Sequence, residues 1–183
     1  NTFVGMKYFK MLFDTPAFWN IMKNTLLISS IKIFLLFPFP VMFALLLNEV
    51  GRTKFGKFVQ VVSYMPHFLS WVIIAGIWID AFSQGGIVTG IMKAFGLEYK
   101  NLMVSKSAII PILTGSEMWR SIGWDSIIYL SAILGISKEL YDAAAIDGAG
   151  RWKTVKHIIL PALAIPMVTV LILNVGFIMS AGL

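Results

Sequence analysis

The sequence predicts an all-α protein, a polytopic membrane helix bundle that forms a single domain over residues 1–183. Apolar residues make up 58% of the chain and charged residues 13%. A soluble domain has about 25% charged residues, so this chain lacks the charge to cover a water-exposed surface. Four apolar runs reach the roughly 20 residues that a spanning helix needs. The alternating segments typical of a membrane β-barrel are not found, so the spans are predicted to be helices.

The same composition excludes several other classes of protein. The sequence has no cysteine, which excludes a disulfide-stapled scaffold. Its many aromatic and branched residues exclude a disordered chain. The net charge of +6 comes from basic residues spread between apolar blocks, so no nucleic-acid partner is expected. The lipid bilayer is the expected surrounding.

The predicted spans are residues 24–47, 58–79, 108–134 and 158–183. The second and the last contain no charge, and the first contains only Lys32. Each span contains proline, which membrane helices tolerate when neighbours satisfy the freed carbonyls. The prolines are interpreted either as packing kinks or as hinges that move.

Polar stretches separate these spans. Residues 1–23 are predicted to form an interfacial helix, with a new helical turn beginning at Pro16, and residues 80–107 a glycine-containing loop. Residues 48–57 and 135–157 together hold seven Lys and Arg in 33 positions, against six in 51 for the other two stretches. The positive-inside rule therefore favours a cytoplasmic place for the denser pair.

The stretch 135–161 is the most organised polar segment. Ser137 is suited to cap a helix that contains three consecutive alanines, and Gly148 is suited to end it. From Arg151 an amphipathic helix is predicted to run directly into the last span. A push on the short helix would therefore be transmitted into the membrane.

These residues resemble a known signature. Asp142-Ala143-Ala144, then Gly148, and then Ile158-Ile159-Leu160-Pro161 resemble the EAA motif, E-A-A-x3-G-x9-I-x-L-P, of binding-protein-dependent ABC importer permeases. The spacing matches throughout, and aspartate replaces glutamate at the first position. The resemblance implies that the following residues couple the chain to an ATPase: Asp142, Ala143, Ala144, Asp147, Gly148, Ile158, Leu160 and Pro161.

The resemblance covers nearly the whole chain. The segments Phe39-Pro40 and Tyr64-Met65-Pro66-His67 are similar to the branch that handles oligosaccharides and other complex sugars. It implies a type I ABC importer permease core, with about four of six transmembrane helices, so we expect a fragment incomplete at both ends. The implied location is the bacterial plasma membrane, with several passes.

The resemblance also implies partners. These are cytoplasmic ABC ATPase subunits, a second permease subunit that is a paralogue, and an extracytoplasmic solute-binding protein. No enzyme activity, catalytic residue, metal or cofactor is expected in this chain, because the ATP would be used by the partner subunit. The sequence has no G-x4-G-K-[ST] loop for binding phosphates.

Charged and aromatic residues within the third predicted span are candidates for a substrate path. They are Glu117, Trp119, Arg120, Trp124 and Asp125. Such charges usually face a bundle interior or a cavity. Glu117 and Arg120 could instead form a structural ion pair on one helix face, since they are three residues apart. The tryptophans could stack on sugar rings or serve as ordinary packing.

Two other functions compete with the importer. A membrane-embedded enzyme would use Glu117, Asp125 and His67 as acids and bases. A passive channel or scaffold would need no ATP. Neither gives the 142–161 segment a role, so the EAA spacing favours the importer.

Overall fold

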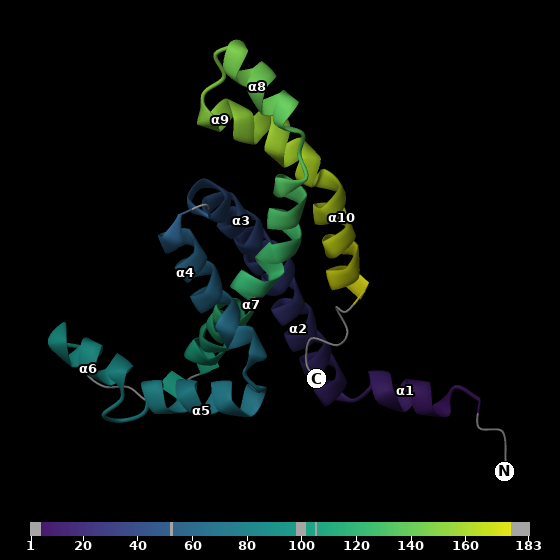
Figure 1. Ribbon diagram of the computed structural model, residues 1–183. Coiled ribbons are helices and arrows are strands. Elements are labelled where there is room, and N and C mark those ends of the chain that lie inside the picture. The colour runs from purple at the N-terminus through teal and green to yellow at the C-terminus, as the bar shows by residue number, and fades with distance from the viewer. Residues whose placement is uncertain (1–4, 52, 98–101, 105, 177–183) are drawn as a thin grey trace.

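A computed structural model describes residues 5–51, 53–97, 102–104 and 106–176 (Figure 1). Every regular element in these ranges is helical, as predicted. The α-helices are α1 Lys7–Phe13, α2 Pro16–Ile31, α3 Pro38–Val50, α4 Lys54–Tyr64, α5 Trp71–Phe82, α6 Ile87–Ala94, α7 Lys106–Leu134, α8 Lys138–Ile146, α9 Arg151–Thr154 and α10 Leu160–Gly176. Two π-helical segments, η1 Lys32–Leu36 and η4 Val155–Ile159, and two 3₁₀ segments, η2 Met65–Phe68 and η3 Leu102–Val104, complete them.

The two π segments let long helices continue past proline. The Phe37 N–H donates to the carbonyl of Lys32, five residues back, and the Leu160 N–H does the same to Val155. Proline follows directly in both cases, at Pro38 and Pro161. Proline cannot donate to the helix, and its ring crowds the preceding turn, so a wider turn accommodates it. The helix therefore continues unbroken on either side of each π segment.

Three helical stretches of the described residues are long and apolar enough to cross a membrane: Pro16–Val50, Trp71–Ala94 and Arg151–Gly176. The first stretch contains the predicted span 24–47. The third contains residues 158–176 of the predicted span 158–183, and residues 177–183 lie outside the described chain. α7, with 29 residues, covers the predicted span 108–134 and is also long enough. Its four charged residues lower its hydropathy below that of the other stretches.

The prediction of one helix over residues 58–79 is wrong. α4 ends at Tyr64, and after η2 the chain is extended at Leu69 and Ser70. The Ser70 hydroxyl then accepts a hydrogen bond from the Ile73 N–H, at 3.3 Å, and begins α5. A serine N-cap competes with helix continuation, and here it follows a proline-containing turn. The expected loop 80–107 is also partly helical, since it contains α6.

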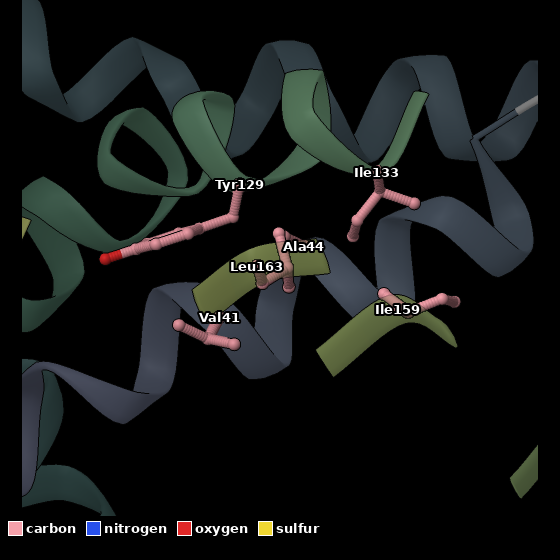
Figure 2. Close-up of a cluster of buried hydrophobic side chains, with 6 residues drawn as sticks. All are labelled: Val41, Ala44, Tyr129, Ile133, Ile159 and Leu163. Carbon is pink, nitrogen blue, oxygen red and sulfur yellow. The ribbon is translucent and has the colours of Figure 1, made fainter. Parts of the chain in front are cut away.

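α7 lies at the centre of the bundle and packs against α3, α4 and α10. In Figure 1, α8 and α9 lie at one end, whereas α1 and α5 lie across the opposite end. A buried apolar cluster joins α3, α7 and the helix formed by η4 and α10 (Figure 2). It consists of Val41, Ala44, Tyr129, Ile133, Ile159 and Leu163.

α4 and α7 cross unusually closely at Gly123. A Cβ atom built there would lie 2.2 Å from the carbonyl oxygen of Ser63. Small residues at such crossings let membrane helices approach each other, because packing rather than water exclusion holds them together. Gly123 therefore fixes where α4 crosses α7.

Candidate functional site

The segment 137–161 forms a helical hairpin at one end of the bundle. The Ser137 hydroxyl accepts a hydrogen bond from the Glu139 N–H, at 3.3 Å, as the sequence predicts. At the other end of α8, Ala149 N–H donates to Ala144 and Gly148 N–H donates to Ala145. This pair of bonds is a Schellman motif, and Gly148 has the left-handed φ of +69° that it requires. The predicted glycine stop is therefore present.

The residues of the EAA-like motif divide between surface and interior. Exposed members are Asp142, Ala143, Asp147, Gly148 and Pro161, and half-buried members are Ala144, Ile158 and Leu160. Ala144 and Tyr141 lie on the inner side of α8, where burial raises the pKa of the Tyr141 hydroxyl.

Two apolar residues on α8 extend its exposed surface. Leu140 is 53% exposed and Ile146 is 86% exposed. With Ala143 between them, they are spaced three apart and share one side of the helix. Leu140 is not among the coupling residues predicted from the sequence, although its apolar character three residues before Ala143 indicates it. The result is a small apolar surface at the tip of the molecule, and apolar surface left exposed often marks a protein contact.

The hairpin is joined rigidly to the bundle. α9 continues through η4 into α10 as one helix, and Ile159 and Leu163 lie in the buried cluster of Figure 2. Arg151 at the start of α9 also forms an ion pair with Glu49 at the end of α3, with 3.5 Å between nitrogen and oxygen. The hairpin is thus held by one buried and one exposed contact.

A cavity of about 380 Å³ lies beside the middle of α7, between η1, α3 and α10. Of the candidate substrate-path residues, Glu117, Trp124 and Asp125 line it, because their spacing places them on one side of the helix. Its other polar lining residues are Lys32, Ser121, Tyr129 and Asn174. These were missed as a group because they come from three helices. The lining mixes hydrogen-bonding groups with aromatic and aliphatic side chains, as small-molecule sites do.

The charged residues of α7 are not paired with each other as the sequence suggested. Glu117 faces Lys32, with 3.9 Å between Oε2 and Nζ. The guanidinium of Arg120 instead donates to the carbonyl of His67, at 3.2 Å, and lies 4.9 Å from the ring centre of Trp71. Arg120 therefore holds the break between α4 and α5, and it does not line the cavity.

The two candidate tryptophans also have different surroundings. Trp124 stacks on the ring of His67, with centroids 4.4 Å apart, and borders the cavity. Trp119 packs edge-on against Trp78 and lies outside the cavity. His67 itself is absent from the lining, so the acids and base of the enzyme alternative do not converge. No group of metal-binding side chains is found among the described residues.

Comparison with known proteins decides between these interpretations. Residues 36–183 match the family described as the binding-protein-dependent transport system inner membrane component. The chain belongs to this family.

Relatives of this permease family with curated names include sugar transporters. The chain is 40% identical over 180 residues to the polygalacturonan/rhamnogalacturonan transport system permease protein YteP of Bacillus subtilis, covering 98% of this chain and 56% of that protein. It is 26% identical to the diacetylchitobiose uptake system permease protein NgcF of Streptomyces coelicolor, covering 88% and 49%. The chain thus spans about half the length of these relatives.

Solved structures agree. The chain resembles a bacterial ABC transporter involved in the import of the acidic polysaccharide alginate, with a TM-score of 0.95 and 34% identity, over 100% of this chain and 64% of that one. A second structure, of a bacterial alginate ABC transporter in complex with an alginate pentasaccharide-bound periplasmic protein, gives a TM-score of 0.92 and 35% identity, over 96% of this chain and 61% of that one. The permease fold predicted from the EAA-like motif is confirmed, and the chain is a membrane component.

Proposed function

We propose that this chain is the transmembrane, pore-forming permease part of an ATP-driven ABC importer for sugars or oligosaccharides. A cytoplasmic ATPase would drive it through the 137–161 hairpin. The ATPase would hydrolyse the ATP, and the chain itself would bind no cofactor. A second, paralogous permease subunit would complete the pore, and an extracytoplasmic solute-binding protein would deliver the solute.

The hairpin is the observation that carries this proposal. It presents an exposed apolar surface at Leu140, Ala143 and Ile146, and it is continuous with α10, in one helical stretch from Arg151 to Gly176. A partner that moved α8 would therefore move α10. The lysine and arginine density around the hairpin supports a cytoplasmic position, where an ATPase is available.

The solute class is supported by the cavity and by the relatives. Two carboxylates, two hydroxyls, an amide and a tryptophan line one cavity, and sugars need both hydrogen bonds and an aromatic face. The names of the proteins above refer to transport of polygalacturonan/rhamnogalacturonan, diacetylchitobiose or alginate. We therefore propose Glu117, Trp124 and Asp125 as residues of the solute path in a multi-pass protein of the bacterial plasma membrane.

A co-purification experiment tests the coupling role. The full-length chain, expressed with its neighbouring subunits, would be solubilised in detergent and captured, and the proteins that come with it identified by mass spectrometry. Ala143→Glu places a charge on the exposed side of α8, and Gly148→Asp puts a side chain at φ +69°. Gly150→Asp is the matched control, because Gly150 has φ −70° and caps α9, a position that aspartate favours.

We expect an ATPase with the wild type and with Gly150→Asp, and its loss with Ala143→Glu and Gly148→Asp. An ATPase that is retained by both variants would remove the hairpin from the mechanism. If no ATPase accompanies the wild type, the importer proposal itself fails.

A further inference from the structure

A second cavity lies beside the earlier part of α7. Its volume is about 300 Å³, and its lining includes Ile110, Thr114 and Trp71. The two cavities have only two lining residues in common, Lys32 and Glu117. These residues form the ion pair described above.

The two cavities follow one another along α7. Their lining on this helix extends from Ile110 to Tyr129, which at 1.5 Å per residue is roughly 30 Å, the thickness of the hydrocarbon core. The second cavity lies toward the end of the bundle away from α8, and the first lies toward it. Lys32 and Glu117 are at the junction between them.

The local structure fixes both sides of this junction. Lys32 is the first residue of the π segment η1, and Glu117 faces it from the middle of α7. Both side chains are partly buried, with exposures of 39% and 28%. On the second cavity's wall, Trp71 is held under the guanidinium of Arg120. The pair therefore sits in a defined place between two walls and does not extend freely into solvent.

We propose that the Lys32–Glu117 ion pair is a barrier that separates two halves of the solute path. The path as such rests on the proposed function. The barrier closes when the Lys32 ammonium and the Glu117 carboxylate meet, because the two side chains then lie across the junction of the cavities and balance each other's charge. The barrier opens when another molecule supplies a hydrogen-bond partner to each of the two side chains.

The chemistry of the pair indicates what can replace it. A lysine ammonium only donates hydrogen bonds, whereas a carboxylate only accepts them. Neighbouring hydroxyl groups of a sugar do both, so one solute can accept from Lys32 and donate to Glu117. A solute with acceptors alone would leave Glu117 without a partner, which is costly when it is partly buried. The pair thus favours hydroxyl-rich solutes.

Cysteine accessibility tests the barrier directly, and the sequence contains no cysteine to interfere. Thr114→Cys places a thiol in the second cavity and Ser121→Cys places one in the first. Each would be introduced into the importer assembled from the full-length chain and cysteine-free partner subunits, in sealed vesicles. A membrane-impermeant maleimide is then added on the side away from the α8–α9 hairpin, without solute.

We expect the thiol at position 114 to react, and the thiol at position 121 to react about tenfold or more slowly, since a minor open state is populated at about 10% or less. Adding Lys32→Met or Glu117→Gln should remove this difference. The exchanged pair, Lys32→Glu with Glu117→Lys, should restore it. Lys23→Met, an exposed lysine earlier in α2, is the matched control and should change nothing.

The barrier proposal would be overturned if the two thiols reacted equally fast while the ion pair is intact. It would also be overturned if position 121 stayed protected in both Lys32→Met and Glu117→Gln. The labelling does not depend on sugar uptake or on the ATPase. Protection that depends on the pair, in a chain that captures no ATPase, would therefore overturn the proposed function and leave the barrier standing.

Discussion

α7 meets two different surroundings along its length. Around residues 110–129 it borders two cavities, and several of its polar side chains face them. Around residues 129–134 it is packed into the buried cluster with α3 and α10 (Figure 2). The packed end lies next to the α8–α9 hairpin. The difference separates two tasks on one helix, since a tightly packed end can pass on a displacement whereas the open part leaves room for a solute.

The strongest test of this contrast is a cavity made in the packed end. Leu163→Ala removes a fully buried side chain, at 0% exposure. We expect a loss of about 2–5 kcal/mol of folding free energy, from lost contacts and the void left behind. The matched control is Leu173→Ala in the same helix, where the side chain is 57% exposed and the change should stay within about 0.5 kcal/mol. Thermal unfolding in detergent measures both, and equal losses would contradict a packed end.

Overpacking the crossing between α4 and α7 should have the next largest effect. Gly123→Ala forces a methyl group against the Ser63 carbonyl, so α4 must move away from α7, at a cost of about 1–3 kcal/mol. Gly115→Ala is the control, because nothing lies within 4 Å of a Cβ atom there. That variant should be neutral or more stable, since alanine favours a helix more than glycine does. A stable Gly123→Ala protein would mean that the crossing is loose.

The open part should respond in uptake and not in stability. Asp125→Asn keeps the size of a cavity-lining side chain and removes its charge, so the unfolding temperature should hardly change. Uptake of oligosaccharide by the reconstituted importer should fall about tenfold, which corresponds to about 1.4 kcal/mol of a hydrogen bond to a charged group. Asp80→Asn on α5 is exposed and outside the cavities, and should leave uptake intact. Equal uptake in both variants would remove Asp125 from the solute path.

The smallest effect is expected at the outer contact of the hairpin. Arg151→Gln breaks the ion pair with Glu49, in which the arginine side chain is 90% exposed. Exposed pairs contribute about 0–1 kcal/mol, and salt reduces this further. Lys153→Gln, also exposed on α9, is the control. If Arg151→Gln loses more folding free energy than Lys153→Gln and the difference persists in high salt, the ion pair holds the hairpin more firmly than the buried cluster does.

Local signals in the sequence predicted the hairpin well. Ser137 and Gly148 act on their own neighbours, through a cap and a left-handed turn, so residue type and spacing determine the outcome. The same holds for the helical nature of the chain, which follows from composition and the bilayer.

Tertiary contacts were less predictable, for physical reasons. Proline alone does not say whether a helix continues, since Pro38 is accommodated by a π turn whereas Pro66 is followed by a break at Ser70. Sequence spacing offers Arg120, a neighbour on the same helix, as one alternative partner for Glu117, but Lys32 from a distant segment pairs with it instead. Which faces meet depends on how whole helices pack, and short-range spacing does not contain that information.

The continuous helix Arg151–Gly176 has a mechanical consequence. Leu163, its fully buried residue, lies near the midpoint, and the helix bends between α9 and α10, so it can act as a bent lever that rotates about Leu163 (Figure 1). At 1.5 Å per residue the arm to Arg151 is roughly 18 Å, and the arm to Asn174 on the cavity wall is roughly 17 Å. If this bent helix rotates about Leu163 without changing its shape, a shift of the hairpin appears at Asn174 with nearly the same size, and the bend between α9 and α10 sets its direction (Figure 1). The leverage is close to one, so the stroke at the cavity wall would match the stroke at the hairpin.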